Sequence, residues 1–365
     1  MKRTFFAALI SGILISSAAY ADPTVIRIGY PGVGVDNQPY GYGDTASLAH
    51  VGHYVEDAFK DNPDIKVQWT FFRGAGPELN EALAAHQLDF AAGLGDLPSI
   101  VGRARGLKTR FLLPASEHGS LYLAVSPNSN INSIDDLKGR KVAQFRGTNL
   151  QIASDAVLEA HHLTEKDVKF VSLTTADGLA ALTSGNVDAS FGGSEYLDLQ
   201  KRGIVKIIYA SKNDAPIFGT NSAFFVTEEF EQAHPDLTQK VVTAFVKAAA
   251  WGSTEANRQA VFEAWSKSGV PVESFAEDLQ GLSLARENTA LVDDFIKARY
   301  ADKAAKAKQY GLIKKDIDLN SWFAPQYLET ALKELKLENF WPTYDANGKK
   351  LTDGTVESQK QAAAQ

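Results

Sequence analysis

The sequence predicts an α/β protein made of two similar lobes, and two observations lead to this fold class. Short apolar runs of strand length alternate with amphipathic runs through about residue 230, which is typical of a mainly parallel sheet flanked by helices. One stretch also recurs: residues 82–96 read ALAAHQLDFAAGLGD, and residues 181–195, which lie 99 positions later, read ALTSGNVDASFGGSE. Because an internal repeat of this kind indicates a repeated structural unit, we expect one copy in each lobe.

The composition excludes several classes of site. The 365 residues include no cysteine, so a disulfide framework, a thiol nucleophile and thiolate metal ligands are excluded. The formal net charge is −7 and the chain has no run of basic residues, so we expect no nucleic-acid partner. The 7 histidines are scattered along the chain. We therefore expect neither a metal site nor a cofactor.

Residues 1–21 have the pattern of a cleaved export signal. Two basic residues precede an apolar stretch over residues 5–17, and the triplet AYA ends at a cleavage site after Ala21. A membrane anchor is the alternative, but the apolar stretch is shorter than the roughly 20 residues of a spanning helix. Cleavage would remove two positive charges and no negative one, and would change the formal net charge from −7 to −9.

The chain after the signal begins with a strand expected at residues 25–30 and a polar, aromatic loop that runs to residue 44. The glycines of this loop suggest a dinucleotide-binding fingerprint, but Asn37 stands where the third glycine is required, so we reject that interpretation. Asp36 and Tyr40 are candidate ligand contacts in the loop. The alternative is that the loop is simply part of the surface.

The stretch 71–98 is the most informative part of the chain. It reads as a strand, a helix opened by a glycine–proline pair, a second strand and the start of a second helix. Asp96 is placed to cap the helix that Pro98 begins. Because open α/β sheets bind ligands at the carboxyl ends of parallel strands, Gly95 and Asp96 are candidate ligand contacts.

The other expected elements continue the α/β pattern and end in a mainly helical segment beyond residue 228. They are a helix over residues 46–59, a helix that follows the loop at residues 146–149 and ends near residue 161, and strands over residues 65–72, 108–113, 121–125, 141–145, 168–171, 187–191, 205–209 and 222–226.

Five motifs resemble one family of proteins when they are taken together. They are FFRGAGPELNEAL, LDFAAGLGDLPSI, SIDDLKGRKVAQFRGTN, GLAALTSGNVDAS and TNSAFFV. The five motifs occur in the same order in the periplasmic substrate-binding proteins of ABC importers for aliphatic sulfonates, taurine and nitrate, and the chain resembles this family. The resemblance implies a type II periplasmic binding protein that holds a small organic anion or zwitterion between its lobes and delivers it to a membrane permease. It also implies a periplasmic location and a monomer.

The resemblance also implies how the chain divides. Each lobe would hold a mainly parallel sheet flanked by helices, and two hinge strands would join the lobes. The expected parts are a first lobe over residues 22–120 and 226–340, a second lobe over residues 121–225, hinge strands at 121–125 and 223–226, and a polar C-terminal tail over 341–365.

An anion between two such lobes would be bound by main-chain N–H groups at helix starts and by arginine side chains. The residues expected to contact the ligand are Asp36, Tyr40, Arg73, Gly95, Asp96, Arg146, Gly147, Thr148, Asn149, Ser194, Glu195 and Asn221. Two alternatives stay open: Thr148 or Asn149 could be an ordinary helix N-cap, and Arg73 could be a solvated loop end.

Asp96 and Glu195 occupy matching positions in the repeat and bear on the charge of the ligand. Two carboxylates near a small anion would repel it, so a ligand that meets both should also carry a positive group. The alternative is that Asp96 only caps its helix.

The sequence contains none of the common catalytic motifs G-x-S-x-G, H-E-x-x-H and G-x-x-x-x-G-K-[ST]. We therefore expect a binding protein rather than an enzyme, although the same fold can host catalysts. A ligand-sensing partner of a membrane receptor remains an alternative to an importer component.

Overall fold

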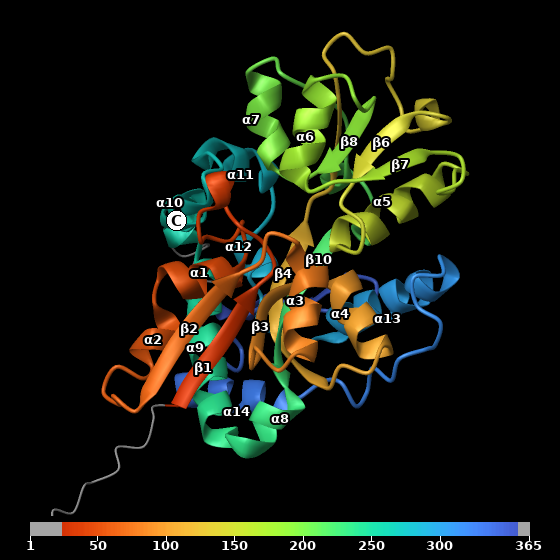
Figure 1. Ribbon diagram of the computed structural model, residues 1–365. Coiled ribbons are helices and arrows are strands. Elements are labelled where there is room, and N and C mark those ends of the chain that lie inside the picture. The colour runs from red at the N-terminus through yellow and green to blue at the C-terminus, as the bar shows by residue number, and fades with distance from the viewer. Residues whose placement is uncertain (1–23, 357–365) are drawn as a thin grey trace, which may run out of the picture.

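The computed structural model describes residues 24–356, so the expected export signal lies outside the described residues. Two lobes lie one above the other (Figure 1). No helix within residues 24–356 is long and apolar enough to cross a membrane.

The sheet of the first lobe has five strands in the order β2-β1-β3-β10-β4. Strands β1, β2 and β3 are parallel to one another, whereas β10 is antiparallel to both of its neighbours. The strand bounds are β1 Thr24–Tyr30, β2 Ile65–Phe71, β3 Phe90–Gly95, β4 Thr109–Gly119 and β10 Thr220–Thr227.

The sheet of the second lobe repeats this arrangement in the order β7-β6-β8-β5-β9. Here β5 is the antiparallel strand between β8 and β9. The strand bounds are β5 Tyr122–Val125, β6 Lys141–Gln144, β7 Lys169–Ser172, β8 Ala189–Gly192 and β9 Lys206–Ala210. Since β3 and β8 take the same place in the two sheets, the repeat found in the sequence corresponds to equivalent elements, and the two-lobed α/β fold is confirmed.

Helices flank both sheets, and most of them belong to the first lobe. The second lobe has α5 Asn149–Ala160, α6 Thr175–Thr183 and α7 Glu195–Lys201. The first lobe has α1 Thr45–Val51, α2 Tyr54–Asp57, α3 Ala75–Ala84, α4 Asp96–Ala104, α8 Glu228–Ala233, α9 Pro235–Ser253, α10 Arg258–Trp265, α11 Val272–Asp278, α12 Leu284–Glu287, α13 Asp294–Gln309 and α14 Pro325–Leu335.

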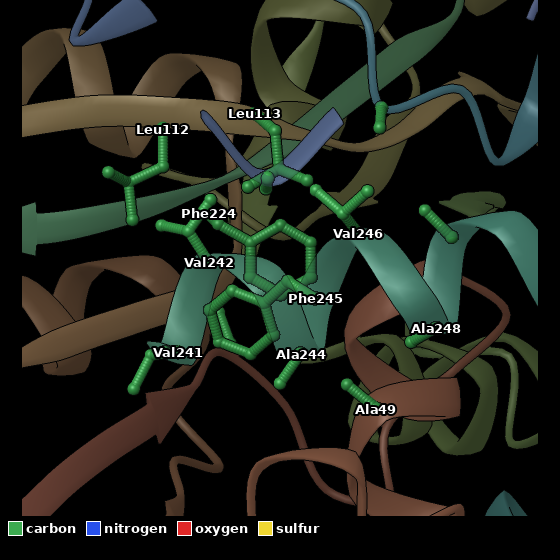
Figure 2. Close-up of a cluster of buried hydrophobic side chains, with 14 of the residues drawn as sticks. Ala49, Leu112, Leu113, Phe224, Val241, Val242, Ala244, Phe245, Val246 and Ala248 are labelled. Atoms are coloured by element: carbon green, nitrogen blue, oxygen red, sulfur yellow. The ribbon is translucent and has the colours of Figure 1, made fainter. Parts of the chain in front are cut away.

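The largest core lies where α9 packs against the first sheet (Figure 2). The rings of Phe224 from β10 and Phe245 from α9 stack with their centroids 4.0 Å apart. Val241, Val242 and Val246 extend the same face of α9, and all three are completely buried. This apolar stripe repeats every three to four residues, which is why α9 is anchored on the sheet along its length.

The expected helix over residues 46–59 is interrupted. It consists of α1 and α2, which are separated by a turn in which His53 has a φ of 53°. This left-handed backbone conformation cannot continue a right-handed helix.

The strands expected to join the lobes lie inside the sheets instead. Residues 122–125 form β5 in the middle of the second sheet, and residues 223–226 belong to β10 in the first sheet. The chain passes between the sheets just outside these strands, at residues 119–122 and 210–220. These two passages meet, because Thr220 pairs with Gly119 at the end of the first sheet.

The segment expected as a polar tail from residue 341 packs against the first lobe as far as residue 356. Trp341 is 1% exposed and its Nε1–H donates to Ser253 Oγ at 2.7 Å. Tyr344 and Val356 are buried as well, and β11 Thr343–Tyr344 pairs with β12 Lys350–Thr352. The burial of these three apolar side chains fixes the segment on the first lobe, despite its polar composition.

Candidate functional site

A cavity of about 720 Å³ lies between the lobes and receives side chains from both. This volume is typical of sites for small organic molecules. Of the twelve residues expected to contact a ligand, the structure places eight in the cavity wall. They are Asp36, Arg73, Gly95, Thr148, Asn149, Ser194, Glu195 and Asn221.

Two helices of the second lobe begin at the cavity. Thr148 is the N-cap of α5, because its Oγ1 accepts a hydrogen bond from Leu150 N at 3.3 Å. Thr174 caps α6 in the same way by accepting from Asp177 N at 3.2 Å. Both threonines line the cavity. A helix N-terminus presents unpaired N–H groups and a partial positive charge, so this wall of the cavity favours an anion.

The sequence left open whether Thr148 is a helix N-cap or a ligand contact, and its position is compatible with both roles. It caps α5, it is 4% exposed, and it faces the cavity.

The start of α4 in the first lobe meets the start of α5 in the second. A Cβ atom added to Gly95 would lie 3.0 Å from the side chain of Asn149, so a larger residue at this position would press on the start of α5. Likewise, a Cβ on Gly147 would lie 2.9 Å from Pro77. The lobes are thus in direct contact beside the cavity, which corresponds to a closed arrangement.

Arg73 is the cavity-lining arginine of the first lobe. Its side chain is 58% exposed, and its Nη2 lies 3.4 Å from Asp177 Oδ1 of α6 in the second lobe. This exposed ion pair is weak, so the guanidinium can turn toward a bound anion.

Four carboxyl groups from α7, α11 and α12 line the cavity, and that of Asp198 is paired with Arg202. The other three form no ion pair among the described residues. They belong to Glu195, Asp278 and Glu287, and together we call them the carboxyl triad. Burial raises the pKa of Glu195 and of Asp278, and the Asp278 carboxylate raises the pKa of Glu195 further. Burial raises the pKa of Glu287 to about 8, and Asp278 contributes to this increase. Sequence analysis identified only Glu195.

The floor of the cavity carries hydroxyl groups from β10. Thr220 and Ser222 are 6% and 7% exposed, and both line the cavity. Ser222 lies opposite Ser116 of β4, whose hydroxyl donates to Glu287 Oε1 at 2.6 Å. The hydroxyl groups of Ser116, Ser222 and Thr220 therefore line the same part of the cavity as the Glu287 carboxyl group.

An apolar wall closes the cavity on the side of α10 and α11. Trp265, Val270, Phe275 and Leu279 line it, and together with the exposed side chain of Tyr42 they form a hydrophobic surface. No motif in the sequence distinguishes these residues from ordinary core residues, so sequence analysis missed them.

Four of the expected contacts lie elsewhere, and Asp96 is the most informative. The side chain of Asp96 has no exposed surface and does not line the cavity. Its Oδ1 accepts from Leu97 N at 2.6 Å, and its Oδ2 lies 3.9 Å from the buried Lys303 ammonium. It is the first residue of α4, and Gly95 occupies the N-cap position. Lys303 neutralises Asp96 inside the lobe, so Asp96 does not face a ligand.

Arg146, Gly147 and Tyr40 are also outside the cavity wall. Arg146 donates to Glu165 Oε2 at 2.9 Å and lies over the ring of Phe170, within the second lobe. The N–H of Gly147 donates to a side chain of its own lobe, and Tyr40 packs against a histidine ring. These local partners turn all three residues away from the ligand space.

Within residues 24–356 no group of three or more histidine, aspartate or glutamate side chains is placed to hold a metal ion. The cavity instead offers a wall with helix N-termini, an acidic side and an apolar wall. Such a site is suited to holding a small organic molecule that carries charge.

Known proteins resemble the chain at the levels of family, sequence and structure. The family described as NMT1/THI5 like matches residues 64–256. An aliphatic sulfonates-binding protein of Bacillus subtilis (strain 168) is 28% identical over 289 residues, which are 77% of this chain and 82% of that protein. The solved structure of a periplasmic sulfonate-binding protein of Methylobacillus flagellatus KT is 31% identical and has a TM-score of 0.74, and the match covers 89% of this chain and 98% of that chain.

A desulfurization enzyme has the same fold, with 17% identity and a TM-score of 0.64 over 85% of this chain and 99% of that chain. Fold alone therefore does not separate binding from catalysis. The family match is more specific: it runs from β2 to the end of α9, and it includes Arg73 and the starts of α5 and α6. The resemblance read from the sequence motifs is confirmed, and the chain belongs to the NMT1/THI5-like family.

Proposed function

We propose that the protein is a periplasmic solute-binding protein that captures a small organic sulfonate between its lobes and delivers it to the membrane permease of an ABC importer. In this proposal the chain is exported, is cleaved after Ala21 and acts as a monomer. The ligand contacts are the starts of α5 and α6, Arg73, and the surfaces around Gly95 and Ser194.

The observation that carries the proposal is the anion-favouring wall inside a cavity bounded by both lobes. Thr148 and Thr174 mark two helix N-termini at this wall, and Arg73 supplies the positive side chain. A sulfonate presents three oxygen acceptors around one negative charge, which suits several convergent N–H donors. The names of the two binding proteins that resemble this chain support the same ligand class.

Titration calorimetry of the mature protein tests the binding step. We expect n-butanesulfonate to bind with micromolar or tighter affinity, and butanoate, nitrate and sulfate to bind more weakly. Arg73→Ala should weaken sulfonate binding roughly tenfold, at the low end for a charge-assisted hydrogen bond, because the side chain is half exposed. Uptake of labelled sulfonate by cells with and without the protein tests delivery to a permease.

Arg146→Ala is the matched control. This arginine lies within the second lobe and outside the cavity, so its loss should leave the affinity within twofold of the parent. Failure of every sulfonate to bind would contradict the proposed function. Equal weakening by the two arginine variants would contradict the proposed position of the sulfonate.

A further inference from the structure

We propose that Tyr122 and Asp278 are positioning residues, whose hydrogen bond holds α11 of the first lobe against the second lobe and keeps one wall of the cavity closed over the ligand. Tyr122 is the first residue of β5, and Asp278 is the last residue of α11, so the bond joins the two lobes. This inference rests on the proposed function, because it concerns how the protein retains the same ligand.

The helix α11 belongs to the first lobe and forms part of the cavity wall. Phe275 and Asp278 of this helix line the cavity, as does the adjoining Leu279. The ring of Phe275 packs against Trp265 of α10, with the ring centroids 5.5 Å apart. Both rings belong to a buried cluster that also contains Leu48 of α1. This packing fixes α11 to the first lobe, so a separation of the lobes would carry α11 away from the second lobe.

Three donors from the second lobe and its adjoining passage reach the end of α11. The Tyr122 hydroxyl donates to Asp278 Oδ1 at 2.5 Å. The ammonium of Lys201 lies 2.9 Å from Glu277 Oε2, and the ammonium of Lys212 donates to the Glu277 carbonyl at 2.7 Å. In Figure 1, α11 lies directly below α7, the helix that ends at Lys201. The second lobe therefore meets α11 at two consecutive residues.

The bond between Tyr122 and Asp278 is the best shielded of the three contacts. Tyr122 is 1% exposed, and its ring lies in a core cluster of the second lobe. The Lys201 side chain is 50% exposed, so its ion pair with Glu277 is weak. A short bond from a hydroxyl to a carboxylate is charge-assisted and stronger than one between neutral groups. Burial raises the pKa of Asp278, and the hydrogen bond from Tyr122 is the largest effect in the opposite direction, so Tyr122 stabilises the charged form of Asp278.

This bond should slow the release of the ligand. If the lobes separate, water can solvate the phenol and the carboxylate, so the bond adds nothing to the open form. In the closed form the Asp278 carboxyl lines the cavity, and a ligand that fills the cavity excludes water from it. Because a hydrogen bond is stronger where water is excluded, the bond resists opening most when the ligand is inside. We therefore expect loss of the bond to shorten the time for which the ligand stays bound.

The variant Tyr122→Phe tests the inference, because it removes the donor and keeps the ring in its core. Calorimetry with n-butanesulfonate should show roughly tenfold weaker binding than in the parent, at the low end for a charge-assisted bond, since water replaces the bond in the open form. Stopped-flow measurements of tryptophan fluorescence should show faster dissociation of the sulfonate at an unchanged association rate, because the bond forms only after the lobes meet.

A double-mutant cycle separates this role from a general effect on the second lobe. In the background Asp278→Ala the Tyr122 hydroxyl has no carboxylate to bind, so adding Tyr122→Phe should change the affinity by less than about twofold. Tyr209→Phe is the matched control, because its hydroxyl donates to Asp214 Oδ2 at 3.2 Å, five residues along the chain, and Tyr209 is outside the cavity wall. This variant should bind n-butanesulfonate as tightly as the parent does.

Two results would overturn the inference and leave the proposed function intact. One is a Tyr122→Phe variant that binds n-butanesulfonate as tightly as the parent does. The other is an equal effect of Tyr122→Phe in the parent and in the Asp278→Ala background, which would assign the loss to packing within the second lobe. A parent that binds no sulfonate would instead overturn the proposed function, and this inference with it.

Discussion

Glu287 is a carboxyl group that the fold keeps almost completely out of water. It is 3% exposed, and it accepts hydrogen bonds from Ser116 Oγ at 2.6 Å and from His118 N at 2.9 Å. These two donors do not offset the loss of hydration, so burial raises its pKa from 4.5 to about 8. In the folded protein Glu287 therefore holds a proton at pH 7 that it would lose in the unfolded chain.

This difference predicts how stability depends on pH. Between the unfolded pKa of 4.5 and the folded pKa of about 8, the folded state binds more protons, so stability falls as the pH rises through this window. The variant Glu287→Gln keeps the shape of the side chain and cannot ionise. Urea unfolding without ligand, at pH values from about 5 to 8, should show the variant gaining roughly 1–3 kcal/mol relative to the parent.

A difference between parent and variant that stays constant across this range would contradict the assignment of the slope to Glu287. Glu117 and Asp44 have raised pKa values of about 7 and 6, so they add slopes of the same sign in both proteins. The comparison of parent with variant removes the contribution of Asp44. Glu117 acts electrostatically on Glu287, so the difference between the two proteins also contains the interaction of these two groups.

At the scale of elements, the closed arrangement depends on contacts far from the cavity. The clearest is between α5 of the second lobe and the end of α13 in the first. Glu159 accepts from Lys306 Nζ at 3.0 Å, from Gln309 Nε2 at 2.5 Å and from Tyr310 Oη at 2.6 Å. These donors lower the pKa of Glu159, which means that they stabilise its charged form. In Figure 1, α13 lies directly below α5, on the side away from α7 and α11.

Breaking this contact should weaken ligand binding without changing the cavity. Glu159→Gln removes a charge that holds the lobes together, so a smaller fraction of the protein is closed before the ligand arrives. We expect a threefold to tenfold loss of sulfonate affinity, as the side chain is partly exposed and screened. Calorimetry measures the loss. Asp316→Asn is the control, because it breaks the ion pair of Asp316 with Lys308 within the first lobe, and an equal loss there would contradict a role in closure.

The elements also explain what could be predicted from the sequence. The strand–turn–helix unit at β3 and α4 could be predicted because its glycines, Asp96 and Pro98 lie within a few residues of one another. The matching unit at β8 and α7 could be predicted because its sequence is similar to that of the first unit. The role of Asp96 could not be predicted, because Lys303, which neutralises it, comes from α13. Asp278 and Glu287 were missed for the same reason: only the packing of α11 and α12 brings them to the cavity.

At the scale of the whole molecule, buried polar groups of the first lobe hold the passage at residues 210–220 and the ends of β4 and β10 beside it. The Lys303 ammonium donates to the carbonyls of Ile217 and Gly219 at 3.0 Å and 3.1 Å. Asn221 donates to the Glu117 carbonyl at 2.6 Å and accepts from Arg299 at 2.9 Å. Because the Lys303 bonds hold the passage at residues 210–220 to the first lobe, a rigid rotation of the second lobe would be absorbed in the few residues beyond Ile217 and Gly219.

We therefore expect the protein to open and close as two rigid bodies. A compact chain of this length has a radius of gyration of about 20 Å, and opening should increase it by on the order of 1 Å. Small-angle scattering should give a smaller radius with saturating sulfonate than without, at a mass that corresponds to one chain. Glu159→Gln should have a larger radius than the parent without ligand and should reach the same radius at saturation, because the ligand supplies contacts that favour the closed form. A radius that does not change when calorimetry confirms binding would contradict closure. A mass of two chains would contradict the proposed monomer, while the comparison of radii would still report the motion within each chain.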